Sequence, residues 1–238
     1  MPGTAHLIAK LIDHSLLHPT LTDEALRAGC ELAKKYQVAS VCIKPYAVPL
    51  AQEVLKESEV AVGTVVGFPH GGNRIETKVK EAEMACDDGA TELDMVLNIG
   101  KVLTHDWDYV ADEIRDLSAV ARRRQALLKV IFENDFLTHD EYKVKLCRLC
   151  NSFPVDFVKT STGFGFVKQP EGLYAYAGAT DHDLELMRRE CSPRIQIKAA
   201  GGVRTLDDVL KVVKLGVTRV GATATEAILT EAIHRGYA

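Results

Sequence analysis

Two lysines each lie near the end of a short apolar run that has the pattern of a buried strand. Each is followed by small residues and glycines. Lys159 lies in VKTSTGFGF (residues 158–166) and Lys198 lies in IKAAGGVRT (residues 197–205). A desolvated lysine beside a second cation has a lowered pKa and becomes a free amine near neutral pH. A free amine can add to a carbonyl and form a Schiff base, which accepts electrons when the neighbouring carbon–carbon bond breaks or forms. The spacing alone leaves open which lysine would be the nucleophile.

Eight β-branched runs alternate with eight segments whose apolar residues recur at helical spacing, and these elements must position the lysines. The runs cover residues 10–15, 38–43, 60–67, 91–98, 126–134, 156–161, 194–200 and 219–223. The helical segments cover residues 22–36, 47–57, 74–89, 106–124, 138–150, 182–191, 205–216 and 225–236. Because no linker interrupts this alternation, the sequence predicts an α/β fold, a (β/α)₈ TIM barrel that forms a single domain over residues 1–238. An open doubly wound sheet is the alternative, but no GxGxxG motif follows the first run and no change in composition divides the chain.

Two of the expected helices begin with a local capping signal. Thr138 with Glu141, and Thr205 with Asp208, have the spacing of a capping box, in which the two side chains bond to exposed backbone N–H groups. We therefore expect both threonines to be helix N-caps.

The active site of such a barrel lies at the carboxyl ends of the strands, where polar residues gather in this sequence. Reading the strand ends in order gives Asp13, Lys44, Asp94, Lys129, Glu133, Lys159 and Lys198. Alternation along a strand predicts that Phe157 shares the face of Lys159. One strand-end charge can simply reach solvent, but four lysines and three acids on one rim indicate a site.

Glycines and threonines follow the last three strands, where barrels commonly bind phosphate through backbone N–H groups and the dipole of the next helix. These residues are Thr162, Gly163, Gly165, Gly201, Gly202, Thr205, Gly221, Thr223 and Thr225. Glycines after strands also serve as plain turns. Their place beside the lysines favours a phosphorylated substrate.

Composition and motif spacing argue against several other classes. A net charge of −4 provides no basic field, so no nucleic-acid partner is expected. No apolar run approaches the ~18 residues that span a bilayer, and no signal-peptide pattern is present, so we expect a cytoplasmic protein with no membrane partner. The eight histidines show no HExxH spacing, and the CxxC of Cys147 and Cys150 lies in an amphipathic segment without a second pair. The sequence therefore predicts no metal and no cofactor.

Eight segments together resemble the deoxyribose-phosphate aldolase family, and they include every expected strand. The segments are LIDHSLL, SVCIKP, VGTVVGFPHGGN, ELDMVLNIG, LKVIFEN, FVKTSTGFG, IKAAGGVRT and RVGATAT. The resemblance implies a class I aldolase that reversibly cleaves 2-deoxy-D-ribose 5-phosphate to D-glyceraldehyde 3-phosphate and acetaldehyde, in the catabolism of deoxyribose phosphate. We also expect a homo-oligomer, a dimer or a tetramer, although the outer helix faces do not distinguish the two.

The resemblance also implies roles for individual residues. Lys159 forms the Schiff base, Lys198 helps to keep it neutral and exchanges protons, and Asp94 shuttles protons through water. Residues that line the site, bind substrate or support the charge network are implied at Asp13, Cys42, Lys129, Thr162, Gly163, Gly201, Gly202, Gly221 and Ala222.

Two parts of the chain depart from the family pattern. Residues 167–180 are longer than the usual glycine-rich link into the next helix, and they include Tyr174 and Tyr176. This insertion is interpreted as a lid, an oligomer contact or a neutral surface segment, with the last favoured. Some family members use a C-terminal tyrosine as a proton relay, but the short tail at Tyr237 argues against that role here.

Two other functions fit parts of the pattern. A barrel isomerase acting on a sugar phosphate would need one general base and no covalent adduct, which leaves the two lysines unexplained. A non-catalytic binding protein of the same fold would have no reason to retain Lys159, Lys198 and Asp94 together. The aldolase is therefore the favoured hypothesis.

Overall fold

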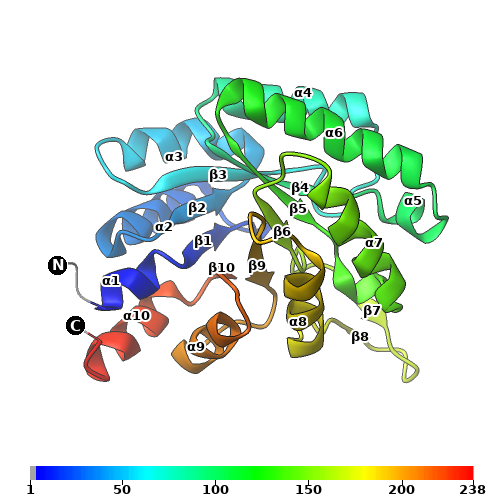
Figure 1. Cartoon of the computed structure of the whole chain (residues 1–238). Coiled ribbons are helices and arrows are strands. Elements are labelled where there is room, and N and C mark those ends of the chain that lie inside the picture. Colours follow the sequence, from blue (N-terminus) through cyan, green and yellow to red (C-terminus); the bar gives the residue numbers. More distant parts are fainter. Residues whose placement is uncertain (1–3, 238) are drawn as a thin grey trace.

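Eight parallel strands close into a barrel in the computed structural model, which describes residues 4–237 (Figure 1). The strands are β1 (Ile12–Leu16), β2 (Ser40–Ile43), β3 (Ala61–Val66), β4 (Glu92–Val96), β5 (Leu127–Ile131), β6 (Phe157–Lys159), β9 (Gln196–Ala200) and β10 (Arg219–Ala222). Around the barrel they follow the order β1-β10-β9-β6-β5-β4-β3-β2, and each neighbouring pair is parallel. The predicted (β/α)₈ fold and the eight strand positions are confirmed.

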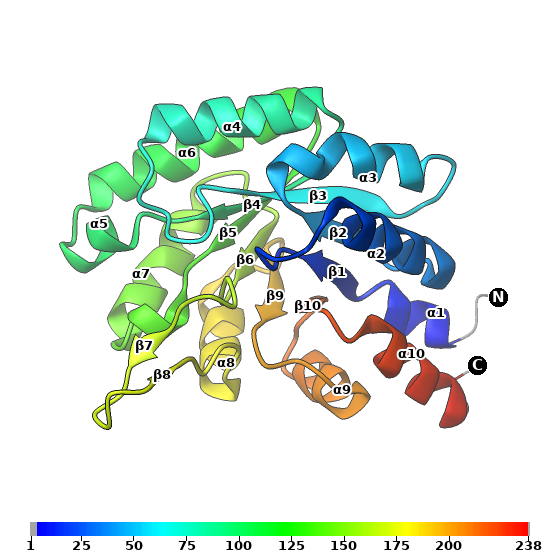
Figure 2. The same ribbon diagram turned by 180° about the vertical axis from the view of Figure 1, so that it is seen from behind.

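Helices form the outer layer around this barrel (Figures 1 and 2). The eight predicted helical segments appear as α2 (Asp23–Tyr36), α3 (Val48–Leu55), α4 (Ile75–Asp87), α6 (Trp107–Arg124), α7 (Asp140–Asn151), α8 (Asp181–Glu190), α9 (Leu206–Lys214) and α10 (Thr225–His234). Short elements that the sequence did not predict are α1 (Thr4–Ala9), α5 (Ile99–Leu103) and two 3₁₀ turns at Pro45–Ala47 and Asn134–Phe136. Within residues 4–237, no helix combines the length and the apolar character needed to cross a membrane.

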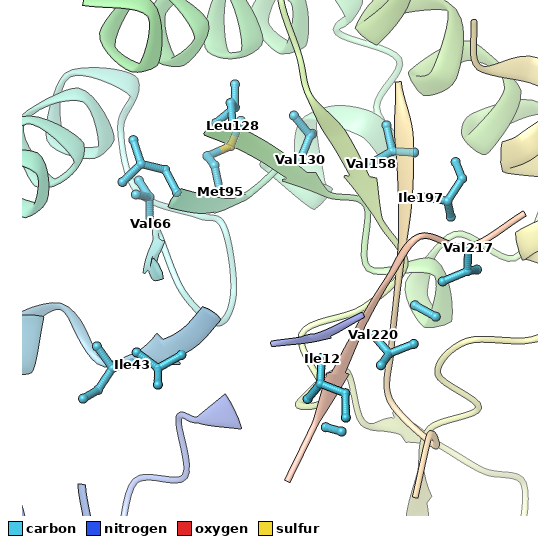
Figure 3. Packing of buried hydrophobic residues seen from close by; sticks show 14 of the residues in the cluster. Ile12, Ile43, Val66, Met95, Leu128, Val130, Val158, Ile197, Val217 and Val220 are labelled. Carbon is cyan, nitrogen blue, oxygen red and sulfur yellow. The ribbon is translucent and has the colours of Figure 1, made fainter. Parts of the chain in front are cut away.

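Strand alternation sends different side chains to the two faces of the barrel wall. Buried apolar residues on the outer face pack against the helices, and Figure 3 shows several of them: Ile12, Ile43, Met95, Leu128, Val158 and Val220. The inner face carries charge instead. Lys129 of β5 contacts Asp13 of β1, and because these strands are not neighbours, the two side chains must meet inside the barrel. Barrel interiors are commonly filled by branched apolar residues, so an ionic layer here signals a use other than packing.

Only one of the two predicted capping boxes is present. Thr205 Oγ1 accepts from the backbone N–H of Asp208 at 3.1 Å, and the Asp208 carboxylate accepts from the N–H of Thr205 at 2.9 Å. The prediction for Thr138 and Glu141 is wrong, because α7 begins after His139 and has no side-chain cap. Thr138 thus lies one residue before the position where its hydroxyl could reach the first turn.

The insertion at residues 167–180 forms an antiparallel hairpin between β6 and α8. Its strands are β7 (Val167–Lys168) and β8 (Tyr174–Ala175), and its turn is closed by a bond of 2.7 Å from Gln169 N–H to the Leu173 carbonyl. Figures 1 and 2 show the hairpin projecting from the barrel beside α7 and α8. Its tip is exposed, whereas its two ends return to the barrel.

The two ends of the described chain lie side by side (Figures 1 and 2). The backbone N–H of Ala5 in α1 donates to the carbonyl of Tyr237, which packs against the hydrophobic core. Because α1 leads into the start of β1, this contact lies at the amino ends of the strands. Tyr237 is therefore placed away from the carboxyl ends of the strands.

His14, on the outer face of β1, gives a testable pH dependence of stability. Burial lowers its pKa to about 4 from the ordinary 6.5. Because the folded state keeps His14 neutral, its contribution is fully present above pH 6.5 and is lost as the pH falls toward 4. Between pH 6.5 and 5 the free energy of unfolding should fall by about 1.5 kcal/mol from this group. Urea denaturation at the two pH values measures this decrease in the free energy of unfolding. His14→Gln should lack the contribution of about 1.5 kcal/mol, whereas His70→Gln, in an exposed turn, should retain it. An equal fall in His14→Gln would contradict the assignment.

Candidate active site

A cavity of about 360 Å³ opens at the carboxyl ends of the strands. Ten of the twelve residues expected at the site line it: Asp13, Cys42, Lys159, Thr162, Gly163, Lys198, Gly201, Gly202, Gly221 and Ala222. The other two, Asp94 and Lys129, lie beneath the cavity and contact residues that line it. The barrel therefore brings together side chains that the sequence spreads over more than two hundred residues.

Two lysines share one carboxylate oxygen at the floor of the cavity. Lys159 is the last residue of β6, and its Nζ lies 2.8 Å from Oδ2 of Asp94 on β4. Lys198 is on β9, next to β6, and its Nζ also lies 2.8 Å from Asp94 Oδ2. All three side chains are buried. The predicted proximity of the two lysines is thus a direct consequence of the register that pairs Lys159 with Lys198.

Beneath this pair, further charges complete an ion cluster. Asp13 Oδ2 lies 2.5 Å from Lys198 Nζ and 2.8 Å from Lys129 Nζ. Lys129 also lies 2.6 Å from Glu92 and 3.0 Å from Asp94 Oδ1, the latter as an ion pair without hydrogen-bond geometry. Arg219, from β10, contacts Asp13 at 2.5 Å and Glu92 at 3.2 Å. The cluster closes the barrel below the cavity.

The ion pairs set the protonation states within the cluster. Burial alone would raise the pKa of a carboxyl and lower that of a lysine, because it disfavours the charged form. Here Lys129, Lys159 and Lys198 outweigh burial and hold the pKa of Asp94 well below its usual range. Lys129 and Lys198 do the same to the pKa of Asp13. The carboxylates in turn outweigh burial and raise the pKa of Lys129 and of Lys198, so both stay protonated at neutral pH.

The lysines do not share these carboxylates equally. Within the described chain, Lys129 contacts three carboxylates, Lys198 contacts two and Lys159 contacts one. Among residues 4–237 the ion-paired cluster contains four basic side chains and three carboxylates: Lys129, Lys159, Lys198, Arg219, Asp13, Glu92 and Asp94. One basic group can therefore lose its proton without leaving a carboxylate uncompensated. Lys159 is the basic group with the fewest partners.

The loop after β6 is held by a buried acid. Glu133 accepts hydrogen bonds from the backbone N–H of Thr162 at 3.1 Å and from its hydroxyl, and it adopts a left-handed backbone with φ 59°. The Thr162 hydroxyl also accepts from the N–H of Phe164 at 2.9 Å. Both hydroxyl functions of Thr162 are thus engaged inside the protein. Thr162 lines the cavity as expected, but its hydroxyl fixes the loop.

The turn after β9 offers donors for an anion. In the described chain, the N–H groups of Gly202 and Val203 donate to no protein acceptor, and the next residue, Arg204, also lines the cavity. Two free N–H groups beside a cation and a helix N-terminus form a favourable place for a phosphate. The hydroxyls expected from Thr205 and Thr225 are engaged elsewhere, with the α9 cap and with His14.

Several residues that line the cavity were not predicted from the sequence. They are Ser15, Leu17, Phe164, Phe166, Tyr176, Ala200, Val203 and Arg204. His18, near the end of the first strand, also lines the cavity. Ser15 could have been found, since it shares the inner face of β1 with Asp13 two residues away. Phe166 and Tyr176 had no such signal, because the path of the insertion was unknown. Lys44 was expected on the rim but does not line the cavity, because it turns to the Leu21 carbonyl at 3.0 Å.

One group of described residues outside the cavity has the spacing of a metal site. Ligand atoms of Asp140, His182 and Asp183 lie within 4.8 Å of one another on α7 and α8. Lys143 already pairs with Asp140 at 3.1 Å and with Asp183 at 2.5 Å. The cation that these carboxylates bind is therefore the lysine side chain.

Buried lysines that share a carboxylate beneath a cavity, with an anion-binding turn above them, fit an aldolase of the (β/α)₈ class. Residues 7–235 match the DeoC/LacD family aldolases, and the chain belongs to this family. It is 46% identical over 227 residues to the deoxyribose-phosphate aldolase of Rhodopirellula baltica, covering 95% of this chain and 90% of that protein. It is 45% identical over 225 residues to the deoxyribose-phosphate aldolase of Caldanaerobacter subterraneus, covering 94% and 93%. The tetrameric deoxyribose phosphate aldolase of Aeropyrum pernix superposes with a TM-score of 0.84 at 26% identity, covering 97% and 92%.

Lys129→Met tests the role of the ion cluster in stability. Methionine keeps most of the side-chain volume but leaves the carboxylates of Asp13, Glu92 and Asp94 without their common cation. Removal of one partner from a buried ion network costs about 3–5 kcal/mol, so the free energy of unfolding should fall by that amount. Urea denaturation measures it, with Lys168→Met on the exposed hairpin as a control expected to stay within about 0.5 kcal/mol. An unchanged midpoint for Lys129→Met would show that the cluster is not ionised as described.

Proposed function

We propose that this aldolase reversibly cleaves 2-deoxy-D-ribose 5-phosphate to acetaldehyde and D-glyceraldehyde 3-phosphate through a Schiff base on Lys159. The names of its relatives support the substrate. The unequal ion pairing supports the nucleophile and is the observation that carries the proposal. Lys159 lines the cavity with one carboxylate partner, whereas Lys129 and Lys198 are held protonated by three and two. An ammonium group has no lone pair with which to attack a carbonyl.

The chemistry begins on the open-chain sugar phosphate. The free Nζ of Lys159 adds to the C1 aldehyde, and loss of water from the carbinolamine gives an iminium. Removal of the proton from the C3 hydroxyl sends the electron pair of the C2–C3 bond into the iminium, which releases D-glyceraldehyde 3-phosphate and leaves an enamine. Protonation of the enamine at C2, followed by addition of water and release of the amine, frees acetaldehyde and restores Lys159.

Lys198 and Asp94 act on the charge and the protons of this sequence. The protonated Lys198 opposes a second positive charge on Lys159, since both amines contact one oxygen of Asp94. This repulsion favours the free amine before the substrate arrives. Asp94 holds both amines in place and passes protons between them and the reacting atoms through water when the carbinolamine forms and collapses.

The remaining cavity residues accommodate the rest of the substrate. The N–H groups of Gly202 and Val203, with the positive charge of the neighbouring Arg204, suit the 5-phosphate. Cys42, near the lysines, forms a neutral wall, because burial raises the pKa of its thiol to about 11. Small residues elsewhere leave room for the sugar carbons: Gly163, Gly201, Gly221 and Ala222.

Three further properties belong to the proposal. One closed sheet and one main hydrophobic core draw on both ends of the described chain, which supports a single catalytic domain over residues 1–238. Six free cysteines support a reducing compartment, the cytoplasm, where the enzyme would break down deoxyribose phosphate. The tetrameric relative from Aeropyrum pernix supports a homo-oligomer.

Borohydride reduction tests the Schiff base and its position. After incubation with acetaldehyde or with the sugar phosphate, reduction should leave a stable adduct on the Lys159 peptide, located by mass spectrometry. Lys159→Met should lose the adduct and lower kcat by at least about 1,000-fold. Lys168→Met, at an exposed position, is the control and should keep both. Full turnover without any adduct, or an adduct on Lys198, would refute the mechanism.

Lys198→Met tests the role of the neighbouring cation. Because both Nζ atoms lie 2.8 Å from Asp94 Oδ2, they are at most about 5.6 Å apart. Two like charges at that distance and an effective dielectric constant of about 20 repel by about 3 kcal/mol. Without Lys198, Asp94 favours the protonated form of Lys159, so the free amine appears only at higher pH. The pH profile of the rate should therefore shift to higher pH by about two units, and most activity at neutral pH should be lost. A loss of activity that is equal at every pH would contradict this role.

A further inference from the structure

The hairpin insertion contributes two aromatic side chains to the cavity. Phe166 precedes β7 and Tyr176 follows β8, so they face each other across the base of the hairpin. Their ring centroids lie 5.2 Å apart at an interplanar angle of 89°, an edge-to-face pair. Both residues line the catalytic cavity, where Phe166 is 45% exposed, whereas Leu173 and Tyr174 at the tip are 74% and 65% exposed. The base and the tip of the hairpin therefore have different surroundings.

The end of the hairpin that carries Tyr176 is tied to the barrel at two points. The Asp135 carboxylate, after β5, accepts from the backbone N–H of Ala177 at 2.5 Å and from that of Gly178 at 3.1 Å. The N–H of Ala179 donates to the Gly201 carbonyl at 3.0 Å. The approach is so close that a Cβ at Gly178 would lie 2.6 Å from that carbonyl oxygen. These contacts fix the backbone that immediately follows Tyr176.

The ring of Tyr176 lies over the anion-binding turn. Its Cε2 is 3.3 Å from the place where a Cβ of Gly201 would stand, and Gly201 begins the turn that presents the free N–H groups of Gly202 and Val203. Among residues 4–237 no protein group forms a hydrogen bond with the Tyr176 hydroxyl. The phenol is therefore a donor without a protein acceptor, at the wall of the cavity and beside the place that suits a phosphate.

We propose that Tyr176 is a substrate-binding residue whose hydroxyl donates a hydrogen bond to the phosphate, and that Phe166 is a positioning residue that holds the ring. The inference rests on the proposed function for the identity of the phosphorylated substrate. It also changes the favoured interpretation of residues 167–180, because the base of the insertion becomes part of the site and only the tip remains a surface segment. Tyr176 would therefore favour the binding of a phosphate monoester over that of the corresponding free alcohol.

Tyr176→Phe tests the hydroxyl while it keeps the ring, and Tyr174→Phe at the exposed tip is the matched control. Loss of a hydrogen bond to a charged group should raise KM for 2-deoxyribose 5-phosphate by about tenfold or more. KM for unphosphorylated 2-deoxyribose should stay within about twofold, as should both values in Tyr174→Phe. An unchanged KM for the phosphate ester, or an equal rise for both sugars, would overturn the proposal.

Phe166→Ala tests positioning. In the wild-type background it should raise KM for the phosphate ester severalfold. Added to the Tyr176→Phe variant it should have little effect, because Phe166 acts by positioning the Tyr176 hydroxyl. Additive effects of the two substitutions would contradict a positioning role.

Direct binding separates this inference from the aldolase assignment. Calorimetric titration with glycerol 3-phosphate measures the anion site without turnover, and Tyr176→Phe should weaken binding by about tenfold. If the wild type neither cleaves the sugar phosphate nor traps an adduct on Lys159, the proposed function fails, while this titration still decides the role of Tyr176. Equal affinity in wild type and Tyr176→Phe would refute that role.

Discussion

Oδ2 of Asp94 lies 2.8 Å from the Nζ atoms of both Lys159 and Lys198, and the arrangement of the site depends on this shared contact. One oxygen cannot fully compensate two ammonium groups in a buried setting, where charges are poorly screened. Lys198 has a second carboxylate in Asp13, at 2.5 Å, but Lys159 has no second one among residues 4–237. The contact therefore distinguishes the two lysines that line the cavity, because Lys159 has less carboxylate compensation than Lys198.

The barrel makes this ranking possible because its closure brings distant strands to one interior. Asp13 and Lys129 belong to β1 and β5, on opposite sides of the ring, and they meet only when the sheet is closed. The charges occupy inner-face positions, while outer-face positions such as Val158 and Ile197 hold the wall against the helices (Figure 3). The outer faces of the strands thus stabilise the fold, and the inner faces of the same strands carry the charged groups of the site. The cluster holds the floor rigid, and the loops above it supply the anion-binding turn and the aromatic wall.

Much of this arrangement could be predicted from the sequence, because strand periodicity and strand-end chemistry are local signals. They predict eight strands, the (β/α)₈ fold and the placement of Lys159 and Lys198 on one rim. No local pattern shows how deep in the barrel a side chain lies. Asp94 and Lys129 were expected at the site, yet they lie beneath the cavity and contact residues that line it. Lys44 has the same strand-end position, but a nearby carbonyl draws it away.

The insertion shows the limit of sequence reasoning more clearly. Phe166 and Tyr176 are ten residues apart, and no periodicity relates them, because the hairpin register alone brings their rings together. The contacts that return the chain to the barrel run from Asp135 to Gly178 and from Ala179 to Gly201. Such contacts join segments more than twenty residues apart, and a pattern search within one segment does not detect them. The same holds for the capping residue of α7, where a shift of the N-cap by one residue, to His139, removes the predicted role of Thr138.

The charge state of Lys159 in the free enzyme is the central claim. ¹⁵N NMR of protein labelled at lysine Nζ measures it directly, with the signals of Lys159 and Lys198 assigned from the Lys159→Met and Lys198→Met variants. At neutral pH and without substrate, we expect the ¹⁵N chemical shift of a neutral amine for Lys159 Nζ and that of an ammonium for Lys198 Nζ. Ammonium shifts for both, or a neutral Lys198 beside a charged Lys159, would contradict it.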